Sequence, residues 1–152
     1  MAGRRTRRRL SFPGKIALLA MLILSAVLFF RWDNTALQVT ETTVSLANLP
    51  AGFDGCRLAV LSDLHGAEFG EDNADLFAAV LQAKPDYIFY LGDLEDRYRG
   101  PVPGYAETVA AGLAAIAPTY YVTGNHEWAI GDVPQLKERL RENGVTVLFN
   151  QF

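Results

Sequence analysis

The sequence predicts an α/β domain that follows an N-terminal membrane-spanning helix. A long apolar stretch lies near the N-terminus, and four short strand-like runs follow it along the chain. Segments with the apolar spacing of helices separate these runs. Such alternation is typical of parallel strands that are joined by right-handed crossovers.

The apolar stretch covers residues 16–30 (IALLAMLILSAVLFF), in which Ser25 is the one polar residue. Fifteen helical residues rise roughly 22 Å, which is short for a bilayer core of about 30 Å. We expect Lys15, Arg31 and Trp32 to make up the difference at the two ends. Six basic residues precede the stretch: Arg4, Arg5, Arg7, Arg8, Arg9 and Lys15. The positive-inside rule then predicts a cytoplasmic head (1–15), a single-pass signal anchor in the cell membrane (16–32) and an extracytoplasmic domain.

Other interpretations of this segment stay open. A cleaved signal peptide fits the basic head, but residues 29–33 (FFRWD) make a poor cleavage site. A buried core helix would leave the basic head unexplained. Residues 8–10 (RRL) also match a twin-arginine export signal loosely.

The remaining elements are predicted in order along the chain. Residues 37–46 alternate apolar and polar side chains, which predicts a half-buried strand or hairpin. Four strands are expected at residues 57–62, 86–91, 119–123 and 145–149, the first two of the fully buried type. Helices are expected at residues 73–83, 105–116 and 134–143, with Asp72 or Asn73 as the first N-cap and Gly144 as the last C-cap.

Composition and charge exclude several classes of function. From Arg31 onward the chain has eight basic and seventeen acidic residues, a net charge of −9, which argues against a nucleic-acid partner. A single cysteine excludes an intrachain disulfide and a cysteine-based zinc site. The sequence also lacks a nucleotide-binding P-loop and the Gly-x-Ser-x-Gly elbow of serine hydrolases.

Polar clusters follow the first three predicted buried strands. They are residues 62–66 (SDLHG), 92–96 (GDLED) and 124–127 (GNHE), and they contain both histidines of the chain. One such cluster alone is more often a cap or a loop. Because ligand sites of open α/β sheets lie at the carboxyl ends of strands, three successive clusters predict a shared site.

The residue types in these clusters suit a divalent metal. In extended backbone, residues two apart point the same way, so Asp63 and His65 are expected to face one cation. The carboxylate of Asp93 has two oxygens and can bridge two cations, and Asn125 offers an amide oxygen. Such nitrogen and oxygen ligands suit manganese, iron or zinc.

Asp-x-His, Gly-Asp-x-x-Asp and Gly-Asn-His-Glu, in this order, resemble the calcineurin-like metallophosphoesterases. The segments 69–70 (FG), 84–86 (KPD) and Asn73 add a resemblance to the membrane-associated bacterial branch of that family. The resemblance covers the chain from about residue 37 onward, and it implies about half of an α/β/β/α sandwich. It also implies a phosphoester substrate. Some members of the branch hydrolyse UDP-diacylglucosamine or related phosphoesters, so a lipid-linked substrate is one expectation.

The resemblance implies a role for each matched residue. Asp63 and His65 would bind one metal ion, Asp93 would bridge to a second ion, and Asn125 would bind that second ion. His126 would contact the phosphate and protonate the leaving oxygen, with Asp96 and Glu127 as supporting residues. Two divalent ions about 3.5–4 Å apart would activate a water for in-line hydrolysis.

The family pattern normally continues with a further histidine and a Gly-His-x-His motif, whereas this sequence has no histidine after His126. We therefore expect residues 37–152 to be a phosphoesterase domain that is incomplete at its C-terminus. The alternative is a non-catalytic or weakly metal-binding remnant of such a domain.

Four aromatic residues lie near the motif loops: Phe69, Tyr98, Tyr105 and Trp128. Such side chains could line a pocket for a lipid or a base. For most of them, core packing is the expected role.

Overall fold

The structure is a computed structural model that describes residues 11–149, except for the side chains of residues 31–35. It divides into two units, one up to Gln38 and one from Val39 onward, and each is described by itself. The predicted basic head covers residues 1–15, and its first ten residues lie outside the described part of the chain. The side chains of Arg31 and Trp32 also lie outside it.

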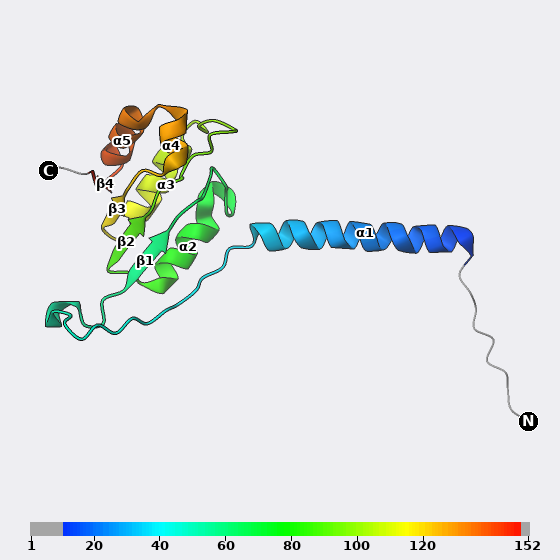
Figure 1. Ribbon diagram of the computed structural model, residues 1–152, viewed down its shortest axis with the longest axis horizontal. Helices are drawn as coiled ribbons and strands as arrows, with labels where there is room; N and C mark the ends of the chain where they lie inside the picture. Colours follow the sequence, from blue (N-terminus) through cyan, green and yellow to red (C-terminus); the bar gives the residue numbers. More distant parts are fainter. Residues whose placement is uncertain (1–10, 150–152) are drawn as a thin grey trace, which may run out of the picture. The chain divides into compact units, whose positions relative to one another are not determined.

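From residue 11 onward, the first unit contains one continuous helix, α1 (Phe12–Thr35) (Figure 1). Its segment Phe12–Phe30 is long and apolar enough to cross a membrane, and none of it is buried within the structure. Its apolar side chains are exposed all round, as in Leu19, Leu22 and Ile23. Nineteen residues rise roughly 28 Å, close to the thickness of a bilayer core. The candidate span covers Phe12–Phe30 and overlaps most of the signal anchor predicted at residues 16–32.

The second unit is built on a four-stranded parallel sheet. Its strands are β1 (Leu58–Leu61), β2 (Tyr87–Tyr90), β3 (Thr119–Tyr121) and β4 (Thr146–Val147), and their order in the sheet follows their order in the chain. All three neighbouring pairs are parallel. The predicted α/β class and the order of its strands are confirmed.

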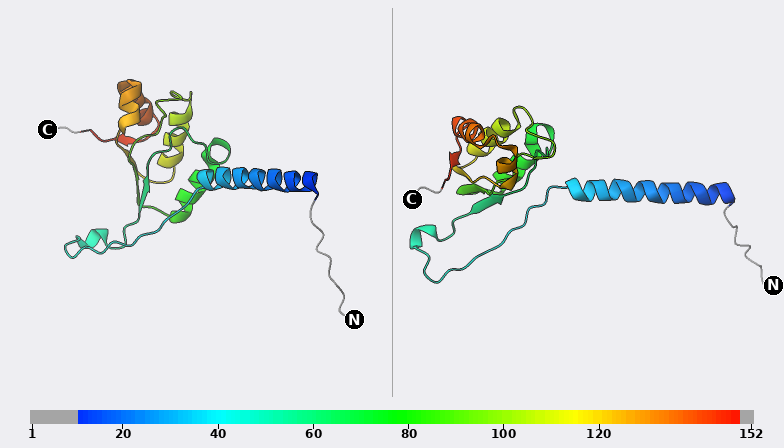
Figure 2. Two further views of the ribbon diagram at one scale, coloured as in Figure 1. Left: turned by 45° about the vertical axis from the view of Figure 1, so that its right-hand side comes forward. Right: turned by 45° about the horizontal axis from the view of Figure 1, so that its top comes forward.

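Helices connect the strands. They are α2 (Ala74–Ala83), α3 (Tyr105–Ala114), α4 (Asn125–Ile130) and α5 (Val133–Glu142), with short 3₁₀ turns at Ala51–Phe53 and Glu71–Asn73. Right-handed crossovers between strands that are adjacent in the sheet place their helices on the same face. Figures 1 and 2 show the helices of this unit along one side of the sheet. Among these α-helices, only the short helix α4 was not predicted from the sequence.

The core lies between the sheet and these helices. Ile88, Tyr90 and Tyr121 point into it from the strands, and Leu113 and Leu136 point into it from the helices. Side chains alternate between the two faces of a strand, so their neighbours lie on the opposite face.

The opposite face of the sheet is open. Leu58 and Val60 of β1 are 56% and 61% exposed, and Phe89 stacks on Tyr120 with a centroid distance of 5.5 Å. The prediction that β1 is a fully buried strand was therefore wrong for one of its two faces. Within residues 11–149, helices cover only the other face.

The prediction of a strand or hairpin at residues 37–46 was also wrong. This segment forms no ladder with any other described segment, and Val39, Val44 and Leu46 are each more than 60% exposed. Alternation of apolar and polar residues specifies which face of a strand is buried, but a strand also needs a partner for its backbone groups. That partner is absent from the described part of the chain.

Candidate metal centre

The structure brings the first two motif loops together at the carboxyl ends of their strands. The amide of Asp63 donates to the carbonyl of Gly92 at 3.1 Å, and the amide of His65 donates to the carbonyl of Asp93 at 2.9 Å. The amide of Gly66 donates to the carbonyl of Leu94 at 2.8 Å. These bonds continue the pairing of β1 and β2 into the loops and hold the two motifs in a fixed register.

The backbone of the motif residues differs from the predicted extended form. Asp63, His65 and Asp93 all have positive φ values, of 57°, 49° and 53°. Residues other than glycine seldom adopt this left-handed conformation, and such strain gathers at functional sites. Asp63 and His65 therefore do not share a direction through extended backbone, and this prediction was wrong. The turns themselves bring the two side chains together.

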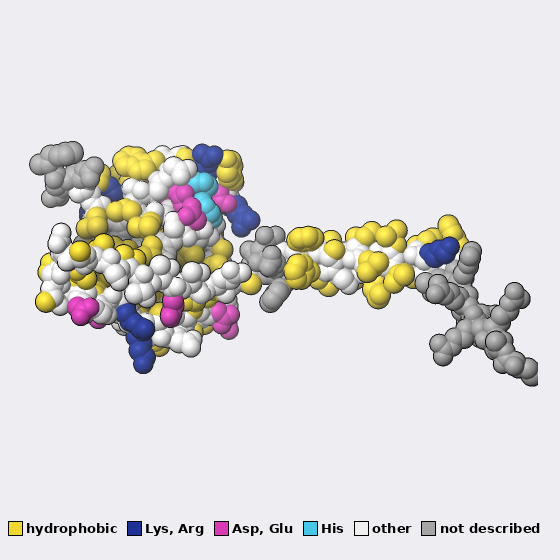
Figure 3. Space-filling model, turned by 60° about the horizontal axis from the view of Figure 1, so that its bottom comes forward, with side chains coloured by type: hydrophobic (Ala, Val, Ile, Leu, Met, Phe, Trp, Pro, Cys, Tyr) yellow, Lys and Arg dark blue, Asp and Glu magenta, His cyan; other side chains and the backbone are white. Residues whose placement is uncertain are grey.

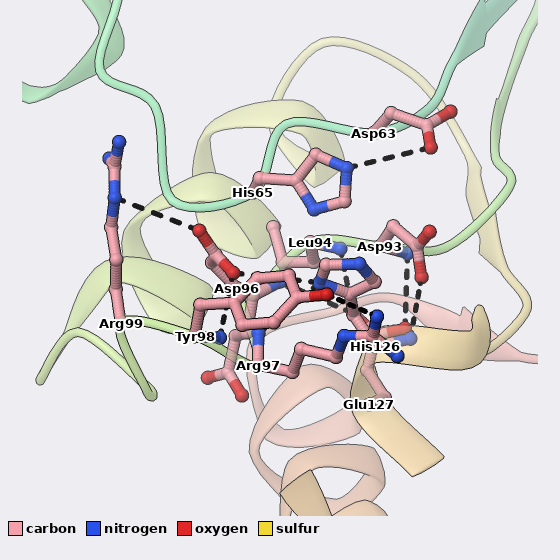
Figure 4. A network of polar contacts seen from close by, with 11 residues as sticks. Asp63, His65, Asp93, Leu94, Asp96, Arg97, Tyr98, Arg99, His126 and Glu127 are labelled. Carbon is pink, nitrogen blue, oxygen red and sulfur yellow. Dashed lines mark hydrogen bonds and ion pairs between the residues drawn. The ribbon is translucent and has the colours of Figure 1, made fainter. Parts of the chain in front are cut away.

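Three side chains gather within the reach of one ion. Potential ligand atoms of His65, Asp93 and His126 all lie within 4.8 Å of one another, and the two imidazole rings are 4.3 Å apart. Asp63 joins this group, since its Oδ1 lies 3.7 Å from Nε2 of His65. Figure 4 shows these four side chains around one region, with Asp96 beside them.

Two observations show that this group fits a cation. The buried Nδ1 of His65 has no hydrogen-bond partner within the described residues, although a buried ring nitrogen normally has one. Asp93 is a buried carboxylate, and no lysine or arginine of the described chain forms an ion pair with it. A buried charge of this kind needs a compensating partner. A divalent ion with nitrogen and oxygen ligands meets both needs.

Glu127 holds the second and third motifs together. It is 1% exposed, and its Oε2 accepts hydrogen bonds from the amides of Asp93 (3.0 Å) and Gly124 (2.7 Å). Its Oε1 accepts from the amides of Leu94 (2.7 Å) and Glu95 (3.2 Å). One carboxylate thus satisfies four backbone donors and fixes the loop that carries Asp93.

Arg97 and Asp96 contact His126 at the Nδ1 atom of its ring. Its Nδ1 accepts a hydrogen bond from the amide of Arg97 at 3.2 Å and lies 3.7 Å from Oδ1 of Asp96. Its own amide donates to Oδ1 of Asp93 at 2.9 Å. Because Nδ1 is occupied as an acceptor, the neutral ring carries its proton on Nε2.

Asn125 is the predicted ligand that the structure connects least to the group. It opens α4 directly before His126, and it is exposed. Its side chain forms no hydrogen bond with any described residue. The sequence alone places it beside the other ligands.

An ion-pair network next to the site was not predicted from the sequence. Glu95 is 2% exposed, and Nη2 of Arg139 binds its Oε1 at 3.3 Å. The same guanidinium binds Glu107 of α3 and Asp132, each at 3.1 Å. Burial raises the pKa of Glu95, and the charge of Arg139 opposes that rise. No sequence signal links these residues, because Glu95 and Arg139 are 44 positions apart.

The four aromatic residues near the motifs divide into two pairs. Tyr105 is buried and donates its hydroxyl proton to the carbonyl of Ala67 at 2.6 Å, and Phe69 packs against the core. Tyr98 and Trp128 are 77% and 59% exposed. Core packing, the expected role for most of the four, therefore applies to Tyr105 and Phe69 but not to Tyr98 and Trp128.

Comparison with known proteins agrees with this geometry. The family model described as calcineurin-like phosphoesterase matches residues 56–151. A "Transmembrane protein with metallophosphoesterase domain" of Bos taurus is 30% identical over 146 residues, which is 95% of this chain and 32% of that protein. A protein of the same name from Danio rerio is 28% identical over 136 residues, covering 87% of this chain and 31% of that protein. "Phosphodiesterase YaeI" of Escherichia coli strain K12 is 32% identical over 99 residues, covering 62% and 37%.

The chain spans about a third of the length of these curated relatives. No solved structure matches it. The family match covers well over half of the chain, including all three motifs. The chain belongs to the calcineurin-like phosphoesterases.

Proposed function

We propose that this protein is a membrane-anchored phosphoester hydrolase that uses water activated between two divalent metal ions. The observation that carries the proposal is that His65 and Asp93 lie together beside His126. Within the described residues, the buried Nδ1 of His65 has no hydrogen-bond partner, and no lysine or arginine pairs with the buried carboxylate of Asp93. Family membership supports phosphoester hydrolysis as the reaction class.

Each predicted site residue has a role in this proposal. Asp63, His65, Asp93 and Asn125 would hold the ions, whose identity among manganese, iron and zinc is open. Divalent ions in such a site lower the pKa of water and neutralise charge on phosphoryl oxygens. His126 carries its proton on Nε2 and delivers it to the leaving oxygen, since the Arg97 amide occupies Nδ1. Asp96 and Glu127 hold His126 and the Asp93 loop in place.

The proposed cellular setting rests on α1. Its apolar segment Phe12–Phe30 would anchor the protein in the cell membrane as a single span, with a cytoplasmic head and the domain of residues 37–152 outside the cytoplasm. Two relatives with the word transmembrane in their names support the anchor. A lipid-linked phosphoester is the substrate that such an anchor favours, and the name of the Escherichia coli relative supports a phosphodiester.

The alternative function is a weakly metal-binding, non-catalytic domain. One observation favours it: Asn125, the only proposed protein ligand besides Asp93 for the second ion, is exposed, and its side chain forms no hydrogen bond with a described residue. Metal binding without hydrolysis by a folded sample would support this alternative.

The test uses the full chain in detergent with manganese and bis(p-nitrophenyl) phosphate. We expect metal-dependent hydrolysis that a chelator removes and manganese restores. Asp93→Asn should lower kcat/KM on the order of 100-fold, since it removes the carboxylate shared by both ions. Asp54→Asn, at an exposed aspartate remote in sequence from the motifs, should leave kcat/KM within about twofold. Equal rates for the two variants would refute the proposed role of Asp93.

A further inference from the structure

Arg139 of α5 joins three separate parts of the domain through one guanidinium group. Its Nη2 lies 3.3 Å from Oε1 of Glu95 in the second motif, and its Nε lies 3.1 Å from Oε1 of Glu107 in α3. Its Nη1 lies 3.1 Å from Oδ2 of Asp132, the residue directly before α5. Because a guanidinium holds its donors in a rigid planar fork, these contacts fix directions as well as distances.

Glu95 occupies a central place in the loop of the second motif. It is 2% exposed, and it lies between Asp93, the proposed bridging ligand, and Asp96. Oδ1 of Asp96 lies 3.7 Å from Nδ1 of His126. A shift of the Glu95 backbone would therefore move both of its neighbours, one at the proposed ions and one at the histidine.

The same guanidinium also contacts the segment that follows the third motif. The helix α4 begins in that motif and covers Asn125–Ile130, and Asp132 follows it after a single glycine. Arg139 binds Asp132 with one nitrogen and Glu95 with another. One side chain thus sets the spacing between the loop of the second motif and the helix of the third.

Net stability explains this network poorly. Three carboxylates around one guanidinium leave an excess of negative charge, and Glu95 loses its hydration on burial. Replacing a buried ion pair by apolar residues of similar volume is often neutral or stabilising. Glu107 and Asp132 are partly exposed, so water solvates them without help from Arg139. The fixed geometry of the contacts is what apolar residues would not supply.

We infer that Arg139 is a positioning residue of the proposed metal centre, because through Glu95 it holds the loop that carries Asp93 and Asp96. This inference rests on the proposed phosphoesterase function and adds to it a residue outside the three motifs. Arg139 acts on the site through Glu95 alone. It takes no part in the bond-breaking step.

The test replaces the ion pair by apolar side chains, Glu95→Met/Arg139→Met, in the full chain in detergent. Acidic side chains lie beside the histidines on the surface (Figure 3), so a change in net charge would by itself alter the affinity for a cation. The double variant removes one charge of each sign and leaves the net charge unchanged. Its urea midpoint should not fall, whereas its dissociation constant for manganese, measured by calorimetry, should rise about tenfold.

The kinetics of the same double variant give a second readout. At saturating manganese, kcat for bis(p-nitrophenyl) phosphate should fall about fivefold while KM stays within about twofold, because the ground-state contacts of the substrate are unaffected. A protein that was only less stable would show neither change below its unfolding transition.

Two further variants serve as controls. Glu138→Gln/Arg141→Gln removes an exposed pair within α5 with the same change in charge, and it should leave the manganese affinity and kcat within about twofold of the parent. Arg139→Lys keeps the charge, but one ammonium cannot bind three carboxylates in fixed directions. We expect it to stay folded by near-ultraviolet circular dichroism and to bind manganese about threefold more weakly.

Manganese binding and hydrolysis separate this inference from the proposed function. If Glu95→Met/Arg139→Met binds manganese more weakly than the parent but neither hydrolyses the diester, the role of Arg139 stands and the proposed catalysis fails. If the parent hydrolyses the diester and the double variant keeps its manganese affinity, the role of Arg139 is wrong. If the double variant does not fold, Arg139→Lys decides: weaker manganese binding supports the inference, and unchanged binding overturns it.

Discussion

At the scale of single residues, the carboxylates of Glu127 and Asp93 have different roles in the site. Glu127 is fully enclosed and accepts four backbone hydrogen bonds, whereas Asp93 is buried without a basic partner in the described chain. A carboxylate that accepts several amide hydrogen bonds has little capacity left for a metal ion. We therefore propose that Glu127 positions the loop, which leaves Asp93 available for a metal ion.

These different roles of Glu127 and Asp93 predict that Glu127→Gln strongly destabilises the folded protein. The new amide group would turn donor hydrogens toward backbone amides that are themselves donors, which leaves at least two of them unsatisfied. We expect the free energy of unfolding to fall by about 2–6 kcal/mol, at roughly 1–3 kcal/mol for each of two buried unsatisfied groups. Urea unfolding of the full chain in detergent measures this loss.

A second measurement separates positioning from stability. At a urea concentration at which both proteins remain folded, Glu127→Gln should bind manganese at least about tenfold more weakly, because the Asp93 loop is released. Glu138→Gln, on the exposed surface of α5, should change neither quantity beyond about 0.5 kcal/mol. Unchanged manganese affinity in Glu127→Gln would show that the hydrogen bonds to Glu127 do not position Asp93.

At the scale of elements, α3 links the core to the loop that follows the first motif. Tyr105 begins α3, is 8% exposed and donates to the carbonyl of Ala67 at 2.6 Å. Burial raises the pKa of Tyr105 to about 12. In the unfolded chain its pKa returns to about 10.

The sign of the pH effect follows from these two values. Below pH 10 the tyrosine is protonated in both states, and its contribution is fully present. As the pH rises from 10 to 12, the unfolded state loses the proton and the folded state keeps it, so stability falls by about 1.4 kcal/mol per pH unit. Burial also raises the pKa of Tyr90 and Tyr121, and those residues act in the same direction.

Tyr105→Phe isolates one of these contributions. It should cost about 1 kcal/mol at pH 7, where a hydrogen bond is lost, and that deficit should shrink and then reverse as the pH approaches 12. Urea unfolding of both proteins at a series of pH values measures the difference. Parallel stability curves from pH 9 to 12 would contradict the raised pKa of Tyr105.

Much of the element order could be predicted from the sequence, because parallel strands and their connecting helices have distinct apolar periods. The helix α4 was missed because it has six residues, too few to show a period. Its flanking glycines, Gly124 and Gly131, were its available signal. The strand predicted at residues 37–46 is absent for a different reason. Its apolar and polar residues alternate clearly, but alternation does not supply a neighbouring strand to pair with.

The candidate site could be predicted as a set of neighbours, since polar residues at successive strand ends converge at one edge of a parallel sheet. Its backbone could not be predicted, because left-handed turns at Asp63, His65 and Asp93 leave no periodic trace. The contact between Glu95 and Arg139 depends on how α5 packs, and no local pattern records it.

At the scale of the whole sheet, burial is one-sided. Parallel sheets are normally covered on both faces, and here helices cover one face within residues 11–149, while Leu58 and Val60 remain exposed on the other. An exposed apolar surface of this kind favours association. The open face makes the stability of the sheet depend on the side chains of the helix-covered face.

Two truncations, Ile88→Ala and Val60→Ala, test this asymmetry. Ile88 is 0% exposed and points into the core, so Ile88→Ala should cost about 2–5 kcal/mol through lost burial and the cavity it leaves. Val60 is 61% exposed on the open face, so Val60→Ala should cost no more than about 0.5 kcal/mol. Urea unfolding of the full chain in detergent, followed by near-ultraviolet circular dichroism, gives both values.

The ratio of the two costs is more informative than either value. A large cost for Ile88→Ala with a negligible cost for Val60→Ala means that the helix-covered face alone stabilises the sheet. If Val60→Ala instead costs 1 kcal/mol or more, the open face is packed against something in the folded sample. Repeating the measurement over a range of protein concentrations then identifies self-association, because only a contact between copies makes the cost of Val60→Ala grow with concentration.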